Sequence, residues 1–217
     1  MGNDDTLLLQ AQGLDRQLGP RWLWRDLALQ LQPGDRLALV APSGAGKTLL
    51  LRSLALLDPL QQGELFLRGR TPAAWGLPVW RSRLIYLAQR PVLFPGTVRD
   101  NLQAVFQLAV HQQRHWQPET LAGWLESLGR DETFLDLDAE RLSGGEAQLL
   151  NLLRALQLDP DILLLDEPTA SLDPASTAAV EDLLAGWLEA GDRACVITSH
   201  DGEQLRRFGN RRLELAV

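Results

Sequence analysis

Cysteine and lysine each occur once in this chain of 217 residues. Because a disulfide needs two thiols, the lone Cys195 excludes any disulfide within the chain and any metal cluster held only by cysteines. A single thiol is typical of proteins from a reducing compartment and argues against a disulfide-stapled secreted domain. Cys195 lies inside the apolar run 194–197, so we expect it to be a small buried hydrophobic residue.

The sequence also has no run of about 18 apolar residues, the length that a membrane-spanning helix requires. The opening segment Met1–Asp5 lacks the basic and apolar regions of a secretory signal. With 28 acidic and 21 basic residues, the net charge is −7, so no basic field would attract nucleic acid or anionic lipid. We expect a cytoplasmic protein without a nucleic-acid partner, folded as one domain over residues 1–217.

Three unbroken apolar runs span residues 37–40, 162–165 and 194–197, and each is followed by polar residues. Runs without alternation are typical of parallel strands that are covered by helices on both faces. Open α/β sheets bind their ligands at the carboxyl ends of such strands. The sequence therefore predicts an α/β fold with a mainly parallel core sheet, flanking helices and a ligand site at one edge.

Two other regions predict additions to this core. Residues 7–31 and 63–69 mix apolar and polar residues at short spacing, as in the edge strands of a smaller antiparallel layer at the N-terminal side. Residues 97–141 are mostly compatible with helix, and we expect helices over 101–113 and 119–128. This stretch predicts an inserted helical subdomain at approximately 95–145.

The loop after the first apolar run has the pattern of a phosphate loop. Residues 41–48 read Ala-Pro-Ser-Gly-Ala-Gly-Lys-Thr and precede a stretch of helical length at 48–57. They match the P-loop pattern at every fixed position except the first, where Ala41 stands in place of glycine. Glycines let successive N–H groups point into one concavity, and the following helix adds its positive end. The predicted nucleotide-binding residues are Ser43, Gly44, Ala45, Gly46, Lys47 and Thr48.

Lys47 is the only lysine, because 20 of the 21 basic residues are arginine. A chain that otherwise uses arginine keeps lysine where a compact, rotatable point charge is needed, and here the ammonium would reach the outer phosphates. The Thr48 hydroxyl would bind Mg²⁺. If the loop requires a left-handed backbone at Ala41, the missing glycine costs roughly 1–2 kcal/mol.

A second acidic element follows the apolar run 162–165. Asp166 would supply a carboxylate to the Mg²⁺ shell, and Glu167 beside it is placed to act as general base on an attacking water. The alternative is a capped turn that leads into a helix after Pro174. Together with the phosphate loop, the two carboxylates predict nucleotide hydrolysis.

One further motif distinguishes among P-loop proteins. Residues 142–146, Leu-Ser-Gly-Gly-Glu, resemble the signature of ABC-type ATPases. The other family elements follow the same order, because Gln89 resembles the Q-loop glutamine, residues 171–173 the D-loop and His200 the switch histidine. Ser143 with Glu146 also forms a capping box, so the signature is expected to start a helix as well.

The resemblance implies a P-loop NTPase fold and a composite site. Two chains would pair head to tail, and each ATP would lie between one phosphate loop and the partner's signature. Glu167 would polarise the water, His200 would contact the γ-phosphate, and Asp173 would link the two sites. The implied catalytic residues are Glu167, His200 and Gln89; the implied metal ligands are Thr48, Gln89 and Asp166; the implied signature contacts are Ser143, Gly144 and Gly145.

The resemblance also implies a biological role, namely the ATP-hydrolysing subunit of a membrane transporter. Such a subunit would lie on the inner face of the membrane through separate permease chains that dock on residues 90–102. The sequence of residues 90–102 is most similar to that of small ATPases of the iron-export type. The alternatives are a soluble ABC ATPase that acts in assembly or regulation, and a P-loop kinase, which leaves the signature unexplained.

The sequence departs from the family pattern at two further places. Leu149 stands where the family usually has a basic residue, which would remove a charge near the interface. The aromatic residue that stacks on adenine would fall near Leu18, so either Trp22 or Trp24 replaces it, or nucleotide affinity depends mostly on the phosphates and base selectivity is poor.

Overall fold

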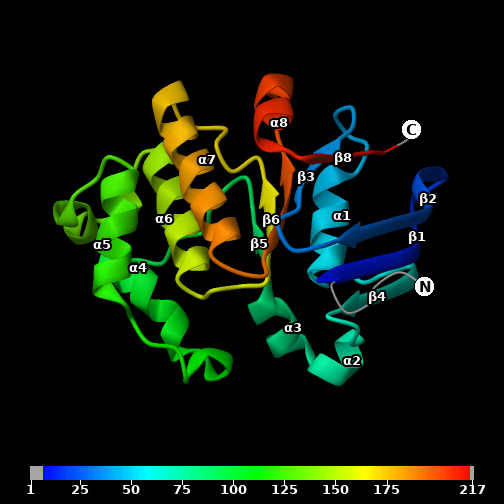
Figure 1. Ribbon diagram of the computed structural model, residues 1–217, viewed down its shortest axis with the longest axis horizontal. Coiled ribbons are helices and arrows are strands. Elements are labelled where there is room, and N and C mark those ends of the chain that lie inside the picture. The colour runs from blue at the N-terminus through cyan, green and yellow to red at the C-terminus, as the bar shows by residue number, and fades with distance from the viewer. Residues whose placement is uncertain (1–6, 216–217) are drawn as a thin grey trace.

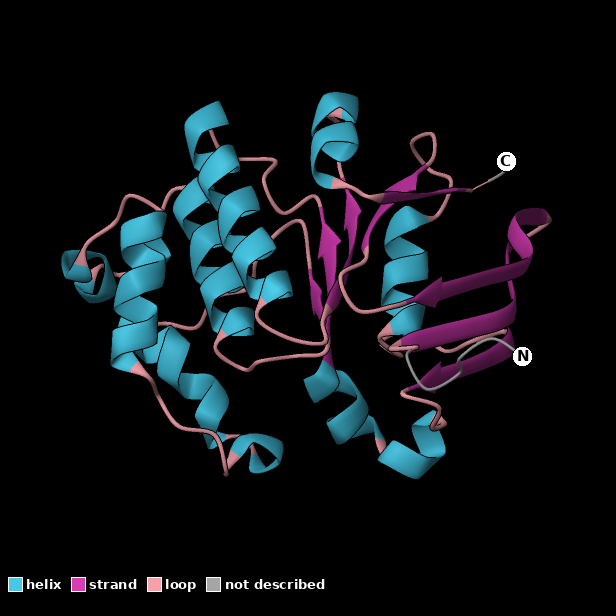
Figure 2. Ribbon diagram, in the orientation of Figure 1, coloured by secondary structure: helices cyan, strands magenta, loops and turns pink. Residues whose placement is uncertain are grey.

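The computed structural model describes residues 7–215, so the opening segment Met1–Asp5 lies outside the described residues. Two sheets and their helices form adjacent layers (Figures 1 and 2). The strands are β1 (Leu9–Leu18), β2 (Arg21–Leu31), β3 (Arg36–Val40), β4 (Gln62–Leu67), β5 (Leu84–Leu87), β6 (Ile162–Asp166), β7 (Ala194–Thr198) and β8 (Arg211–Glu214). The α-helices are α1 (Lys47–Leu54), α2 (Pro72–Trp75), α3 (Leu77–Arg83), α4 (Val98–Ala104), α5 (Pro118–Ser127), α6 (Gly144–Leu156), α7 (Pro174–Glu189) and α8 (Gly202–Phe208).

The core sheet has the strand order β5-β6-β7-β3-β8, and every neighbouring pair is parallel. All residues of β6 and β7 are buried, which explains their unbroken apolar sequences. The parallel sheet predicted from the three apolar runs is confirmed. The two outer strands, β5 and β8, are short and were not predicted.

The smaller sheet has the order β2-β1-β4 and is antiparallel, which confirms the predicted layer. It lies on the far side of α1 from the core sheet (Figure 1). Gly63 is required where β4 approaches β1, because a Cβ there would lie 2.6 Å from the main-chain oxygens of Gln12 and Gly13. Its φ of +97° also favours glycine.

Alternate residues of the core strands contribute to two apolar clusters on opposite faces of the sheet. Leu164 and Val196 pack with α1 and the small sheet, whereas Leu163 and Cys195 pack with the helices on the other face. Cys195 is fully buried, and burial raises the pKa of its thiol to about 12, as expected for an inert hydrophobic residue. The sheet is therefore held between α1 on one face and α6 and α7 on the other.

The helical region differs from the sequence prediction in one place. The helix expected over 101–113 instead spans Val98–Ala104 as α4. It starts earlier because Thr97 and Asp100 form a capping box. It ends at Ala104, after which two short 3₁₀ turns follow, separated by the extended Leu108. The helix expected over 119–128 is confirmed as α5 within one residue, whereas α2, α3 and α8 were not predicted.

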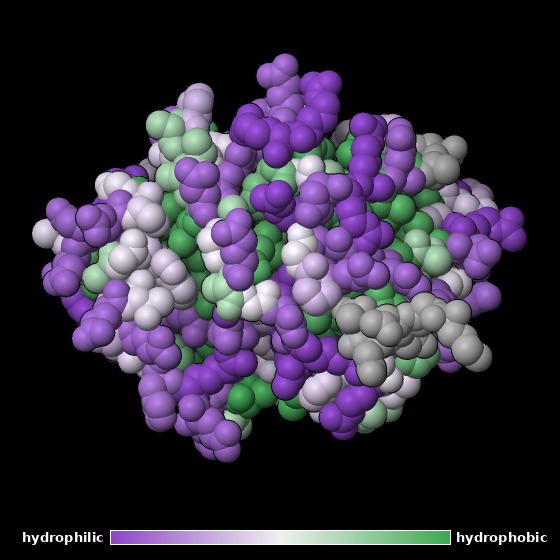
Figure 3. Space-filling model, viewed as in Figure 1, coloured by the Kyte–Doolittle hydropathy of each residue, from purple (hydrophilic) through white to green (hydrophobic). Residues whose placement is uncertain are grey.

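Hydrophilic side chains cover most of the face shown in Figure 3. Among residues 7–215, no helix is both long enough and apolar enough to cross a membrane.

Candidate functional site

Four loops meet at the carboxyl edge of the core sheet. They follow β3, β5, β6 and β7, whose ends adjoin in the strand order. The loop after β3 is the phosphate loop, and Gln89 follows β5. Asp166 ends β6, Glu167 follows it, and His200 lies two residues after β7. Parallel pairing therefore gathers side chains that are far apart in the sequence.

The phosphate loop has the backbone that its glycines predict. Gly44 and Gly46 have φ values of +75° and +93°. A Cβ at Gly46 would lie 2.6 Å from the ring of Trp24 and 2.9 Å from the side chain of Leu23, so glycine is required there. Ala41 is not among the non-glycine residues with positive φ in the described part of the chain. The strain considered for Ala41 therefore does not arise.

Lys47 begins α1, directly after the loop. Its Nζ donates to the main-chain oxygens of Ala41 at 2.9 Å and Pro42 at 3.5 Å. The ammonium thus lies against the start of the phosphate loop, and it would bind the same phosphates as the N–H groups of that loop. The α1 N-terminus, the curled backbone and this single positive charge together make a site suited to a polyphosphate.

Asp166 accepts hydrogen bonds from three hydroxyl groups and is 4% exposed. Thr48 Oγ1 and the Tyr86 hydroxyl donate to Oδ2 at 2.8 and 3.0 Å, and Thr198 Oγ1 donates to Oδ1 at 2.9 Å. Burial, with Asp166 beside it, raises the pKa of the Tyr86 phenol, so this hydroxyl remains a donor. The carboxylate is held in one orientation.

Tyr86 and Thr198 were not identified from the sequence. Thr198 pairs in register with Asp166, and Tyr86 lies on the neighbouring strand β5. Two signals were available: Thr198 is the first polar residue after the apolar run 194–197, and Tyr86, the single tyrosine, lies three residues before Gln89.

The donor set at Asp166 fits a magnesium ion. The Thr48 hydroxyl and the Asp166 carboxylate are hard oxygen ligands, and their oxygen atoms lie 2.8 Å apart. Mg²⁺ commonly takes one or two protein ligands and completes its shell with phosphate oxygens and water. The part of the chain that the structure describes has no group of three or more His, Cys, Asp and Glu residues that could hold a metal by themselves.

Glu167 brings the three predicted catalytic residues together. Gln89 Nε2 donates to its Oε2, and His200 Nε2 lies against its Oε1, both at 2.7 Å. The carboxylate of Glu167 is largely buried, whereas the imidazole is 69% exposed. Glu167 has a φ of +52°, which is unfavourable for a residue other than glycine, and Thr198 Oγ1 accepts its main-chain N–H at 3.1 Å.

The signature residues lie at the start of α6. Ser143 and Glu146 form the predicted capping box, in which the Ser143 N–H donates to Glu146 Oε2 at 2.9 Å. Hydrogen bonds from Ser143 lower the pKa of Glu146. Ser143 and Gly144 are exposed. Within residues 7–215, no hydrogen bond or ion pair joins residues 143–146 to the phosphate loop.

Asp173 caps α7, and its Oδ1 accepts hydrogen bonds from the N–H groups of Ala175 at 2.9 Å and Ser176 at 3.0 Å. Hydrogen bonding with Ser176 lowers its pKa. The turn after residues 166–169 does lead into a capped helix, as the alternative interpretation expected, since α7 starts at Pro174. This segment therefore caps α7 and also lies at the edge of the hollow that adjoins Glu167 and His200.

The structure corrects two sequence interpretations. Leu149 is 1% exposed and belongs to the apolar cluster beneath α6, so it fills the core and does not mark a missing surface charge. Trp24 is 6% exposed and packs against Gly46, so its ring is unavailable to a base. Leu18 and Trp22 remain exposed, and the Arg25 guanidinium lies 4.7 Å from the Trp22 ring centroid.

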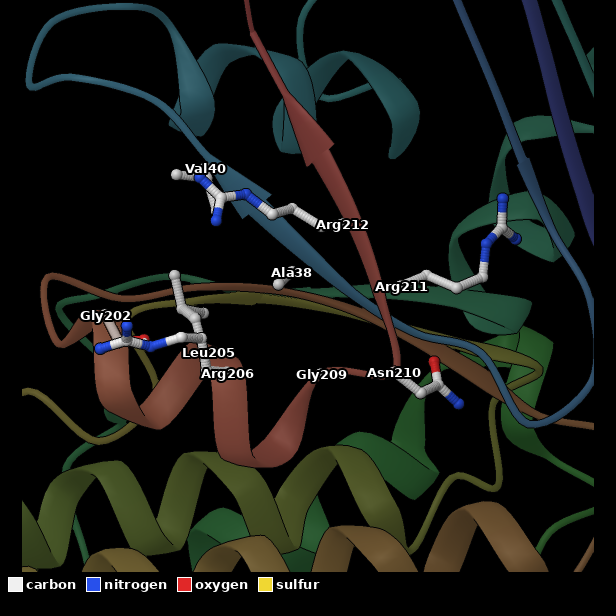
Figure 4. A pocket seen from close by; sticks show the side chains of 9 residues that line it. All are labelled: Ala38, Val40, Gly202, Leu205, Arg206, Gly209, Asn210, Arg211 and Arg212. Atoms are coloured by element: carbon white, nitrogen blue, oxygen red, sulfur yellow. The ribbon is translucent and has the colours of Figure 1, made fainter.

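Two hollows adjoin α8. One of about 580 Å³ adjoins Glu167 and His200 and continues between α7 and α8 to Arg207. The other, of about 460 Å³, lies between α8 and the strands β3 and β8, where Arg206 and Arg212 extend over an apolar floor (Figure 4). Of the predicted site residues, the first hollow contains Glu167 and His200 and the second contains none.

A phosphate loop after β3, together with an aspartate and a glutamate at the end of β6 two strands along the same sheet, defines the class of P-loop nucleotide hydrolases. The family model described as ABC transporter matches residues 24–170, and the chain belongs to this family. Its ATP-binding domain is that of an ATPase, as the order of motifs predicted.

Curated proteins with similar sequences are named as import or export ATP-binding proteins. The chain is 35% identical to the Probable anion import ATP-binding protein of Haloferax volcanii, over 94% of this chain and 75% of that protein. It is 34% identical to the Fe(3+) ions import ATP-binding protein FbpC 3 of Rhodococcus jostii, but spans only 59% of that protein's length. It is 30% identical to the Probable iron export ATP-binding protein FetA of Escherichia coli, over 93% of this chain and 88% of that protein.

Two solved structures have the same fold. One, a structure of the ATP binding subunit of an ABC transporter, superposes with a TM-score of 0.81 at 21% identity and covers 96% of this chain and 85% of that chain. The other is a bacterial Atm1-family ABC exporter with ATP bound, with a TM-score of 0.81 at 21% identity, covering all of this chain and 38% of that chain.

Proposed function

We propose that two copies of this chain pair head to tail around two ATP molecules and drive a separate membrane permease. The observation that carries the proposal is the placement of Glu167 between Gln89 and His200, while Ser143 is exposed and, among the described residues, makes no hydrogen bond to its own phosphate loop. The first arrangement supplies a general base beside the nucleotide. The second leaves each site incomplete until a second chain contributes its signature.

The residues have separate roles in this proposal. Lys47 and the N–H groups of residues 43–48 would hold the outer phosphates. Thr48, Asp166 and the amide oxygen of Gln89 would hold Mg²⁺, which neutralises phosphate charge when bound.

Glu167 would accept a proton from the attacking water, and His200 would hold both that carboxylate and the γ-phosphate. From the partner, Ser143, Gly144 and Gly145 would close the site, and Asp173 would link the two sites.

The proposed docking surface for the permease is residues 90–102. Val92 is 75% exposed and Phe94 is 52% exposed, although both are apolar. The Asn101 side chain fastens this segment to α4, because Oδ1 accepts the Phe94 N–H and Nδ2 donates to the Phe94 carbonyl, both at 2.8 Å. The segment follows Gln89 directly, so a permease bound here would respond to the catalytic site.

As cargo we propose a metal ion, with iron export as the specific case, supported by the likeness to the relative named for iron export. In this role the chain would be cytoplasmic and peripheral on the inner face of the membrane. Other relatives are named for import, so the experiment must measure direction as well as cargo.

The central test is Glu167→Gln. General-base catalysis is worth about 10²–10⁴-fold, so we expect nearly complete loss of ATP hydrolysis with nucleotide binding retained. Gel filtration with Mg-ATP should show a dimer of this variant, and a monomer would contradict the proposal. Co-purification from membranes should recover a multi-span protein, and Val92→Asp should release it. A fully active ATPase with no such partner would instead favour the assembly or regulatory alternative.

A further inference from the structure

Gln148 is a buried side chain that belongs to none of the motifs identified in the sequence. It lies on α6, five residues after Ser143, and is 5% exposed. Burying a primary amide is unfavourable unless its donors and its acceptor find partners. Gln148 satisfies both ends of the amide, and all its partners lie on other segments of the chain.

The amide connects α6 to three loops. Its Nε2 donates to the main-chain oxygens of Gln89 at 3.4 Å and Glu167 at 3.3 Å. Its Oε1 accepts the main-chain N–H of Ser171 at 3.0 Å. One side chain of α6 therefore contacts the main chain of Gln89, of Glu167 and of Ser171.

The start of α6 also packs closely on the D-loop. A Cβ at Gly145 would lie 2.9 Å from the Leu172 side chain and 3.0 Å from the main-chain oxygen of Ser171. A Cβ at Gly144 would lie 3.2 Å from the Ser171 hydroxyl. Because close-packed groups move together, a displacement of the signature is transmitted to residues 171–172.

Such a displacement would change the backbone conformation of Glu167. Its φ of +52° is strained and depends on the surrounding hydrogen bonds. Its main-chain oxygen accepts from Gln148 Nε2 and from the Ala170 N–H at 3.3 Å. The direction of the carboxylate follows from this backbone, so Gln148 contributes to where the general base points.

We propose that Gln148 is a positioning residue that transmits the position of the signature to Glu167 of the same chain. The inference rests on the proposed function, since in a head-to-tail dimer Ser143 and Glu167 of one chain serve different nucleotides. Engagement of the signature at one ATP would then align the base at the other ATP. Gln148 thus couples the two composite sites.

Two substitutions test this role. Gln148→Met keeps the side-chain length and removes all three hydrogen bonds, whereas Gln148→Glu keeps the acceptor for Ser171 and removes both donors. The matched control is Gln157→Met on the residue that caps the other end of α6, whose amide donates to the Leu102 main-chain oxygen. Hydrolysis by the full chain is measured against Mg-ATP concentration, with nucleotide affinity and the thermal unfolding midpoint measured in parallel.

We expect the parent to show a Hill coefficient above one and both Gln148 variants to approach one. Their kcat should fall about tenfold or more, with nucleotide Kd changed by less than about twofold. Gln157→Met should behave as the parent.

A kcat within about twofold of the parent, or a reduced kcat with the parent's Hill coefficient, overturns the inference. So does a parent that is not cooperative. A chain that does not hydrolyse Mg-ATP at all would instead contradict the proposed function.

Discussion

The carboxylate of Glu167 and the imidazole of His200 lie 2.7 Å apart, although 32 residues lie between them in the sequence. The contact exists because β6 and β7 are neighbouring parallel strands whose carboxyl ends coincide. Glu167 is largely buried and His200 is mostly exposed, so the pair connects the interior of the site to its surface. The His200 imidazole is therefore accessible from the surface, whereas the Glu167 carboxylate is shielded.

Gly46→Ala should damage the phosphate loop by two separate effects. The φ of +93° is unfavourable for alanine, and the new Cβ would clash with the buried Trp24 and Leu23. Gly69→Ala is the matched control, because Gly69 has a φ of +70° but no neighbour within 4 Å of a Cβ. We expect the Gly46 variant to lose about 1–3 kcal/mol more of unfolding free energy than the control, together with nucleotide binding. Equal losses in denaturant titrations would show that the clash is relieved without cost.

Tyr86→Phe should weaken metal binding without unfolding the protein. It removes one of the three hydroxyl donors that orient Asp166. Loss of such an outer hydrogen bond typically lowers metal affinity by about 10–100-fold. Titration with Mn²⁺ in the presence of ATP, followed by electron paramagnetic resonance, measures this affinity directly. Metal-free nucleotide binding is the control and should not change. An unaltered Mn²⁺ affinity would mean that Thr48 and Thr198 orient the carboxylate by themselves.

Trp22→Ala should weaken ATP binding, because Trp22 is the exposed aromatic near the position expected to stack on adenine. Stacking of a base on an aromatic ring contributes about 1–3 kcal/mol, so we expect about a tenfold rise in Kd. Leu18→Ala on the neighbouring exposed residue serves as the comparison, with an expected change below about twofold. If both variants bind ATP as the parent does, and GTP is hydrolysed equally well, the phosphates alone provide the affinity.

His111 should make the fold less stable in mild acid. It is 4% exposed, and burial lowers its pKa below the ordinary value of about 6.5. The unfolded chain therefore binds a proton at a higher pH than the folded chain, so this contribution to stability is present above about pH 6.5 and decreases as the pH falls below it. Chemical denaturation between pH 7.5 and 5.5 should show a decline that is smaller in His111→Gln than in the parent. The matched control is His115→Gln, which removes an exposed imidazole.

Local sequence patterns determined the elements that carry the chemistry. The apolar runs before Lys47, Asp166 and His200 predicted three parallel strands, because a strand buried on both faces has no polar alternation. The glycines of the phosphate loop predicted its backbone, because only glycine adopts those φ values without strain. The signature motif predicted both a capped helix start and the family. These features depend on neighbours within a few residues.

Only the tertiary structure decided which side chains meet. The hydroxyls of Tyr86 and Thr198 reach Asp166 because β5, β6 and β7 lie in register, and register is not encoded by any one strand. Trp24 and Leu149 became core residues because other segments cover them. Gln148 acquired its three partners through loops from separate parts of the chain. Contacts of this kind arise from packing between distant segments, so the sequence predicted the motifs, whereas the fold determined the network around them.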